Sequence, residues 1–221
     1  MQTIRKIILI MFLFVSTDVF AQLYESIQAE ATNILLDLSK HQIRTKIDFK
    51  KLNLFLSDAI SSDKLEIKYQ TSLQEVDSLK NHLQLFLSEF DKISTDSALY
   101  LFNQWYLHLS NTFYNYADEK FFSSEKEKIL FFSTSVSCHC TLEMCKNQTI
   151  EILNLARENN LDYWIVDSFE HNELQIKYET LFAPSLLVFN GNNEVVLKIE
   201  YEEKMLEMLL AYFNGKDKSK D

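Results

Sequence analysis

The 221-residue sequence predicts an α/β protein in which an all-α N-terminal region precedes a mixed sheet with helices on both faces. Before residue 125, apolar residues recur every three or four positions, as on an amphipathic helix, without strand-like alternation. After the charged run 124–128, short apolar strand-like segments alternate with helical ones. The earlier of these strands are joined by helices and the last two by a hairpin turn, a combination that predicts a mixed sheet.

The N-terminal region, residues 22–124, is expected to form about four amphipathic helices. In the longest of them, Leu79 and Leu83 belong to one apolar stripe. Thr95 or Asp96 is a suitable N-cap for the last, because both side chains can accept a backbone hydrogen bond. The expected helices span residues 23–40, 48–60, 65–93 and 96–118.

The C-terminal region, residues 125–215, is expected to hold the sheet, and a charged tail, residues 216–221, follows it. The segment ILFFST has the composition of a buried strand. Residues 190–193, Asn-Gly-Asn-Asn, form the expected hairpin turn. The expected strands span residues 129–134, 161–167, 185–190 and 194–199, and the expected helices span residues 141–158, 168–179 and 204–213.

The first 21 residues have the layout of a secretory signal peptide. Arg5 and Lys6 precede the apolar run 7–15, and compact residues lead to a cleavage site after Ala21. The apolar run is much shorter than the roughly 20 residues of a membrane span. We therefore expect an exported, periplasmic chain without a membrane span after signal cleavage. The alternative is an uncleaved N-terminal anchor.

The charge balance excludes some partners. The chain has a formal net charge of −10, and loss of the signal peptide, with two basic residues and one acidic residue, makes it −11. Nucleic acid and anionic lipid repel such a chain, so neither is expected as a partner. The sequence holds no phosphate-binding loop, no Ser/His/Asp constellation and no zinc-protease motif, and we predict no cofactor.

All three cysteines, Cys138, Cys140 and Cys145, lie in the stretch SCHCTLEMCK, where the first strand meets a helix. If Thr141 is the N-cap, Cys140 and Cys145 occupy the N′ and N4 positions, whose side chains meet, and they are a reasonable disulfide pair. If the helix starts earlier, Cys145 continues the apolar stripe and is a small buried hydrophobe. The sequence leaves both registers open.

Cys138 and Cys140 are candidate nucleophiles, because the partial positive charge of a helix N-terminus lowers the pKa of a thiol. His139, between them, would add to this effect if protonated. A Cys138–Cys140 bond would close a small, strained ring that is easily reduced. An exported chain with three thiols leaves at least one unpaired, which indicates mixed-disulfide chemistry, an intermolecular bond or a metal.

Residues 125–213 resemble the thioredoxin superfamily. The resemblance rests on ILFFST–VSCHC, at a strand, loop and helix start, and on KYETLFAPSLLVFNGN, at a helix, proline loop and hairpin. It implies a cis peptide bond before Pro184, facing the cysteines, and a groove lined by Ala183 and Pro184 in which a substrate strand pairs. With the signal peptide and the helical region, the chain is similar to exported thioredoxin-like proteins of Gram-negative bacteria. An ordinary trans proline at a strand start is the alternative for Pro184.

The sequence departs from the family's Cys-x-x-Cys motif, because the resolving position falls on Thr141 or Glu143. The leading expectation is an enzyme that exchanges disulfides with the thiols of other exported proteins or a redox partner protein. Cys138 or Cys140 would attack, and Cys145 or the other member of the pair would resolve. The first alternative is a non-catalytic thioredoxin-fold binding module. The second is a Cu(I) or Zn(II) metallochaperone that adds His139 or the distant His171 to the thiols.

Overall fold

The computed structural model describes residues 23–43, 45–62 and 65–217 of the chain. The expected signal peptide, residues 1–21, lies outside the described residues, as do residues 218–221 of the charged tail. Within the described ranges, no helix is both long and apolar enough to cross a membrane.

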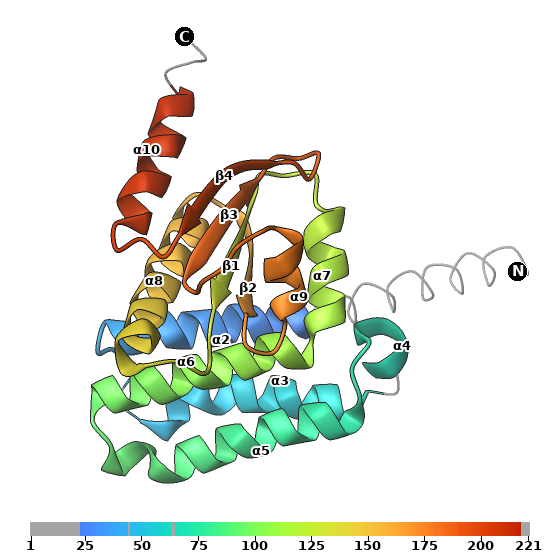
Figure 1. Cartoon of the computed structure of the whole chain (residues 1–221). Helices are drawn as coiled ribbons and strands as arrows, with labels where there is room; N and C mark the ends of the chain where they lie inside the picture. Colours follow the sequence, from blue (N-terminus) through green and yellow to red (C-terminus); the bar gives the residue numbers. More distant parts are fainter. Residues whose placement is uncertain (1–22, 44, 63–64, 218–221) are drawn as a thin grey trace, which may run out of the picture.

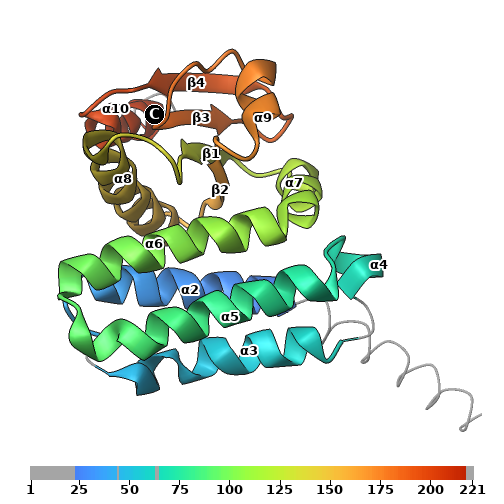
Figure 2. The same cartoon turned by 60° about the horizontal axis from the view of Figure 1, so that its bottom comes forward.

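The N-terminal region is helical, as predicted. Figure 2 shows α2, α3, α5 and α6 as a layer beneath the sheet, with α7 rising from the end of α6 toward it. The helices of this region are α2 (Leu23–Ser39), α3 (Lys50–Ile60), α4 (Leu65–Tyr69), α5 (Leu73–Glu89), α6 (Thr95–Thr112) and α7 (Tyr114–Ser123), with short 3₁₀ turns at Lys46–Phe49 and Phe90–Lys92.

Two of the expected helices are each divided in the structure. The expected helix 65–93 is interrupted after α4, where Gln70 has a positive φ of 51°. Ser72 then starts α5 with a capping box, in which its hydroxyl accepts from the backbone N–H of Glu75 and its own N–H donates to the Glu75 carboxylate. The expected helix 96–118 is interrupted at Phe113, whose φ of −111° and ψ of 24° separate α6 from α7.

The C-terminal region forms the predicted mixed sheet. Its strand order is β2-β1-β3-β4, with β1 parallel to β2 and antiparallel to β3, and β3 antiparallel to β4. Helices cover both faces (Figure 1), an arrangement compatible with a thioredoxin-like fold. The elements are β1 (Lys128–Ser133), α8 (His139–Glu158), β2 (Asp162–Asp167), α9 (Asn172–Lys177), β3 (Ser185–Phe189), β4 (Val195–Glu200) and α10 (Met205–Asp217).

The helical layer and the sheet share one hydrophobic core. Helix α6 packs on β2, and α2 packs on α8. At this junction the Thr32 hydroxyl lies 3.0 Å from the Tyr106 hydroxyl of α6 and 2.8 Å from the Tyr163 hydroxyl of β2. The helical region therefore covers part of the sheet, and the contact between Thr32 and Tyr163 ties it to β2.

Candidate functional site

The loop between β1 and α8 brings the cysteines to the end of the sheet. Asp167, the last residue of β2, holds this loop by accepting a 3.0 Å hydrogen bond from the backbone N–H of Ser135. Cys138 is the N-cap of α8, with an extended φ of −66° and ψ of 156°, and its carbonyl accepts the first helical bond from Leu142 at 3.1 Å. Of the two registers that the sequence left open, the structure adopts the earlier start, and Thr141 is in the first turn.

Cys138 and Cys140 are both free and exposed. Their Sγ atoms are 2.8 Å apart, and the Cys138 Sγ is 3.3 Å from the Thr141 Oγ1. The side chains of Cys140 and Thr141, with the backbone N–H groups of the first turn, lower the pKa of Cys138 to about 6. At neutral pH this thiol is therefore mainly the thiolate, which is the nucleophilic form. His139, between the two cysteines, is exposed.

Cys145 has a different environment. It is 1 % exposed, and burial raises its pKa to about 11. A thiol that is buried and protonated at neutral pH is a poor nucleophile. The structure thus brings Cys138 and Cys140 together and places Cys145 in the core, as the second of the two registers predicts.

The peptide bond between Ala183 and Pro184 is cis, as the resemblance implied. The carbonyl of Pro184 accepts a 2.8 Å hydrogen bond from the backbone N–H of Tyr201, the residue that follows β4. The Tyr201 hydroxyl in turn lies 3.2 Å from the Thr141 Oγ1. Tyr201 therefore connects the cis-proline loop to the first turn of α8, and so to Cys138.

A hollow of about 580 Å³ lies beside these residues, and Ala183, Thr141 and Tyr201 contribute to its lining. Its rim is apolar although exposed: Leu181 is 75 % exposed and Phe182 is 59 % exposed. Exposed apolar residues gathered around a hollow are typical of a binding surface. The hollow and its apolar rim therefore lie next to Thr141, whose hydroxyl contacts Cys138.

Sequence reasoning missed Tyr201. Its only signal is the register of the hairpin: Ser185 pairs with Glu200, so the next residue outward from the turn lies opposite Pro184. Counting outward from the pair of Phe189 and Val195 places Glu200, and not Tyr201, opposite Pro184. An irregularity between Val188 and Phe189 shifts the pairing by one residue and brings Tyr201 there, so a count from the sequence alone would have missed it.

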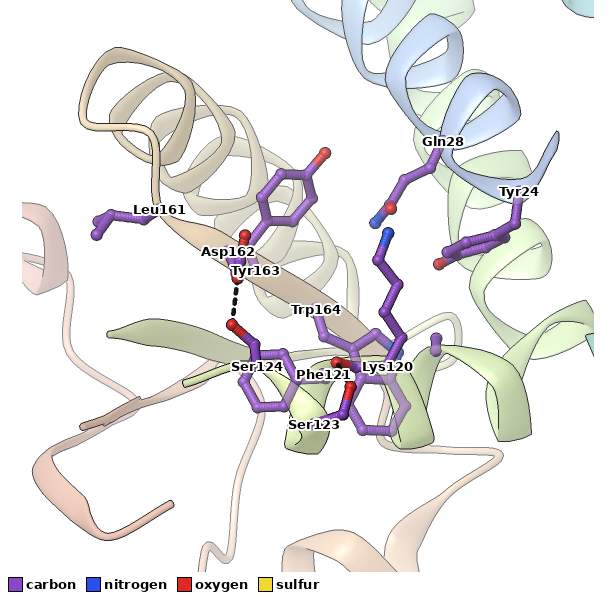
Figure 3. A pocket seen from close by; sticks show the side chains of 11 residues that line it. Tyr24, Gln28, Lys120, Phe121, Ser123, Ser124, Leu161, Asp162, Tyr163 and Trp164 are labelled. Atoms are coloured by element: carbon purple, nitrogen blue, oxygen red, sulfur yellow. Dashed lines mark hydrogen bonds between the residues drawn. The ribbon is translucent and has the colours of Figure 1, made fainter. Parts of the chain in front are cut away.

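A second pocket, of about 340 Å³, lies at the junction of α2, α7 and β2. In Figure 3, Lys120 extends toward Gln28 of α2, and the hydroxyl of Ser124 meets the carboxylate of Asp162. The Lys120 ammonium is paired with Glu25 at 3.0 Å. None of the cysteines lines this pocket, which is therefore separate from the cysteine pair at the start of α8.

A metallochaperone would need a cluster of metal ligands. In the described part of the chain, no group of three or more His, Cys, Asp or Glu side chains is placed to hold an ion. His171, the expected distant ligand of such a metal site, stacks on Tyr114 with ring centroids 3.5 Å apart.

Compared with protein-family models and with curated proteins, the sequence matches none of them.

Proposed function

We propose that the chain is an exported, thioredoxin-like thiol–disulfide oxidoreductase that acts on the cysteines of other exported proteins. The observation that carries the proposal is the pair of exposed thiols at the start of α8, with Sγ atoms 2.8 Å apart. In this proposal Cys138 is the attacking thiolate and Cys140 is the resolving thiol. Cys145 was also a candidate for the resolving role, but it is buried, and we therefore assign this role to Cys140.

The reaction is a reversible transfer of two electrons. The Cys138 thiolate attacks one sulfur of a substrate disulfide, so that a mixed disulfide forms and the first substrate sulfur leaves as a thiolate. Cys140 then loses its proton and attacks the Cys138 sulfur, which releases the second substrate sulfur and leaves a Cys138–Cys140 disulfide. The substrate disulfide is reduced and the dithiol of the enzyme is oxidised; the reverse sequence oxidises a substrate dithiol.

The cis-proline loop is the proposed place for the substrate backbone. Strand pairing along β3 begins at Ser185, opposite Phe132, and among the described residues the backbone of Ala183 forms no hydrogen bond. An extended substrate segment can pair with such a free backbone group while its side chains enter the apolar hollow. This arrangement would hold a substrate cysteine near Cys138.

The thioredoxin-like assignment is supported by the strand order β2-β1-β3-β4 and by the cis bond at Pro184. The proposed export is supported by the signal-like layout of residues 1–21. Expression of the full chain in a Gram-negative host tests export, because cleavage after Ala21 gives a periplasmic product whose first residue is Gln22. Recovery of the intact chain from the cytoplasm alone would refute it.

A glutathione titration tests the proposed exchange. The purified chain is equilibrated over a series of reduced-to-oxidised glutathione ratios, trapped with an alkylating reagent and weighed by mass spectrometry. We expect one reversible transition that consumes two thiols, is lost in Cys138→Ser and Cys140→Ser, and persists in Cys145→Ser. Absence of a reversible transition, or loss of it in Cys145→Ser alone, would contradict the proposal.

A non-catalytic binding module is the second candidate, and the exposed apolar rim at Leu181 and Phe182 is the observation that favours it. It would use the same hollow without any change at sulfur. The two functions separate in one binding experiment with a peptide that contains serine in place of cysteine. In the reduced Cys140→Ser variant, a binding module holds that peptide as tightly as the disulfide form of the cysteine peptide, whereas an exchange enzyme retains only the disulfide form, as a mixed disulfide on Cys138.

A further inference from the structure

Two hydroxyl groups extend in series from the cysteine pair toward the cis-proline loop. The Thr141 Oγ1 is 3.3 Å from the Cys138 Sγ and 3.2 Å from the Tyr201 hydroxyl. Thr141 is 6 % exposed, so its hydroxyl has few alternatives to these two partners. Tyr201 lies in the chain 60 residues from Thr141, and only the fold brings them together.

The direction of these hydrogen bonds follows from the number of protons. A thiolate has no proton and can only accept, so Thr141 must donate to the Cys138 sulfur. A hydroxyl has one proton, and Thr141 can then interact with Tyr201 only by accepting the tyrosine O–H. Both hydrogen bonds consequently point toward the sulfur, and each strengthens the other by polarisation.

The backbone of Tyr201 is held in an uncommon conformation. Its φ is 45°, in the left-handed region that a bulky side chain rarely adopts, and its N–H donates to the Pro184 carbonyl at 2.8 Å. Residues that keep such a conformation are concentrated at functional sites, where the surrounding structure holds them in place. Here the conformation aims a tyrosine hydroxyl at the first turn of α8.

From this geometry we infer that Thr141 and Tyr201 are positioning residues, which form a hydroxyl relay to the Cys138 sulfur and select this thiol, rather than Cys140, as the nucleophile. Thr141 stands where a Cys-x-x-Cys motif that begins at Cys138 would have its second cysteine: it supplies a proton donor that cannot form a disulfide, and Cys140 is left for the resolving step. The inference deepens the proposed function and rests on it, because the role of Cys138 as nucleophile comes from that function. The effect of the two hydroxyls on the Cys138 thiol can nevertheless be measured in the reduced protein without any substrate.

The test is the pH dependence of Cys138 alkylation by iodoacetamide in the reduced full chain, mapped to each cysteine by mass spectrometry. Thr141→Val removes the donor and should raise the midpoint of the Cys138 rate profile by about one pH unit, which lowers the thiolate fraction at pH 5 about tenfold. Tyr201→Phe keeps the ring and should raise the midpoint by about half a pH unit, which lowers that fraction about threefold. Thr141→Ser should retain the wild-type profile.

Two controls separate a relay from a general structural effect. Tyr114→Phe removes another tyrosine hydroxyl, which donates to Glu173 away from the cysteines, and should leave the Cys138 profile unchanged. Because Tyr201 acts through Thr141, the double variant Thr141→Val/Tyr201→Phe should shift the profile no further than Thr141→Val alone. An unchanged profile in Tyr201→Phe, or additive shifts in the double variant, would overturn the relay.

The outcomes for the relay and for the exchange reaction are independent. If Thr141→Val fails to fold, Tyr201→Phe still decides the matter, because Tyr201 is 45 % exposed and its ring remains. If the variants shift the Cys138 alkylation profile but the protein shows no glutathione transition, the relay is supported and the exchange reaction is refuted. If the protein shows a glutathione transition but the variants leave the profile unshifted, the exchange reaction is supported and the relay is refuted.

Discussion

The pH dependence of the reaction of Cys138 with a small alkylating reagent follows from its environment. The pKa of this thiol is lowered from 9.0 to about 6 by Cys140, Thr141 and the backbone of the first turn. At pH 7 the thiolate fraction of Cys138 is then about 90 %, compared with about 1 % for a thiol of ordinary pKa. Thiolate availability alone would therefore accelerate alkylation by roughly 90-fold.

A second effect opposes this acceleration. The intrinsic reactivity of a thiolate falls with its pKa, with a Brønsted coefficient of about 0.4–0.5, so three pKa units cost roughly 15–30-fold. The net advantage at pH 7 is only about 3–6-fold. At pH 5, where an ordinary thiol is almost entirely protonated, the same calculation gives a net advantage of roughly 30–60-fold. The alkylation rate of Cys138 should therefore differ most from that of an ordinary thiol at acid pH.

The assay is limited iodoacetamide labelling of the reduced protein between pH 4.5 and 9, quenched and mapped to individual cysteines, with circular dichroism to show that the fold persists at each pH. The expected Cys138 rate rises to a midpoint near pH 6 and is constant above pH 7.5. A rate that still rises tenfold per pH unit between pH 7 and 8.5 would refute the reasoning, because it would mean that the thiol has an ordinary pKa.

Three further predictions concern the core and the helical layer. Thr32→Val removes the hydroxyl that contacts the hydroxyls of Tyr106 and Tyr163, and should lower the free energy of unfolding by about 1–2 kcal/mol and the Tm by about 2–8 °C, measured by thermal unfolding; an unchanged Tm would contradict it. Cys145 should be alkylated only after unfolding in guanidinium, because it is 1 % exposed and has a pKa of about 11. If Cys145 of the native protein is labelled as fast as Cys138, its thiol is not buried. Hydrogen bonds within the α5 capping box lower the pKa of Glu75, so its stabilisation is complete above pH 4.5 and is lost as the pH falls through the folded-state pKa. Glu75→Gln should therefore destabilise the protein by up to about 1 kcal/mol at pH 7 and have no effect near pH 2, as measured by urea unfolding; an equal effect at both pH values would refute the assignment.

Local periodicity explains why the type of most elements could be predicted from the sequence. Helical stripes and short apolar strands are properties of consecutive residues, and the strands at 129–134 and 185–190 were found for that reason. The division between α4 and α5 was also readable, because Ser72 and Glu75 have the spacing of a capping box. The interruption at Phe113 has no comparable signal, since it lies within a continuous apolar pattern.

The details of the site depend on contacts between distant residues, which one sequence does not display. Thr141 is by type a better N-cap than Cys138, yet the helix starts before it, and its hydroxyl contacts Tyr201 instead. That choice of register decided which cysteines meet: Cys140 joins Cys138, and Cys145 enters the core. The position of the thiols could be predicted from the sequence, and their pairing required the three-dimensional structure.

The division of roles between Cys138 and Cys140 is the central claim, and trapping the mixed disulfide tests it most directly. A peptide that carries an internal disulfide is added to the reduced wild-type chain and to its Cys140→Ser variant, and the products are mapped by mass spectrometry. We predict that the variant accumulates the peptide on Cys138, whereas the wild type releases the reduced peptide and ends with a Cys138–Cys140 disulfide. A stable adduct in the wild type, or an adduct on Cys145 in either protein, would contradict the claim.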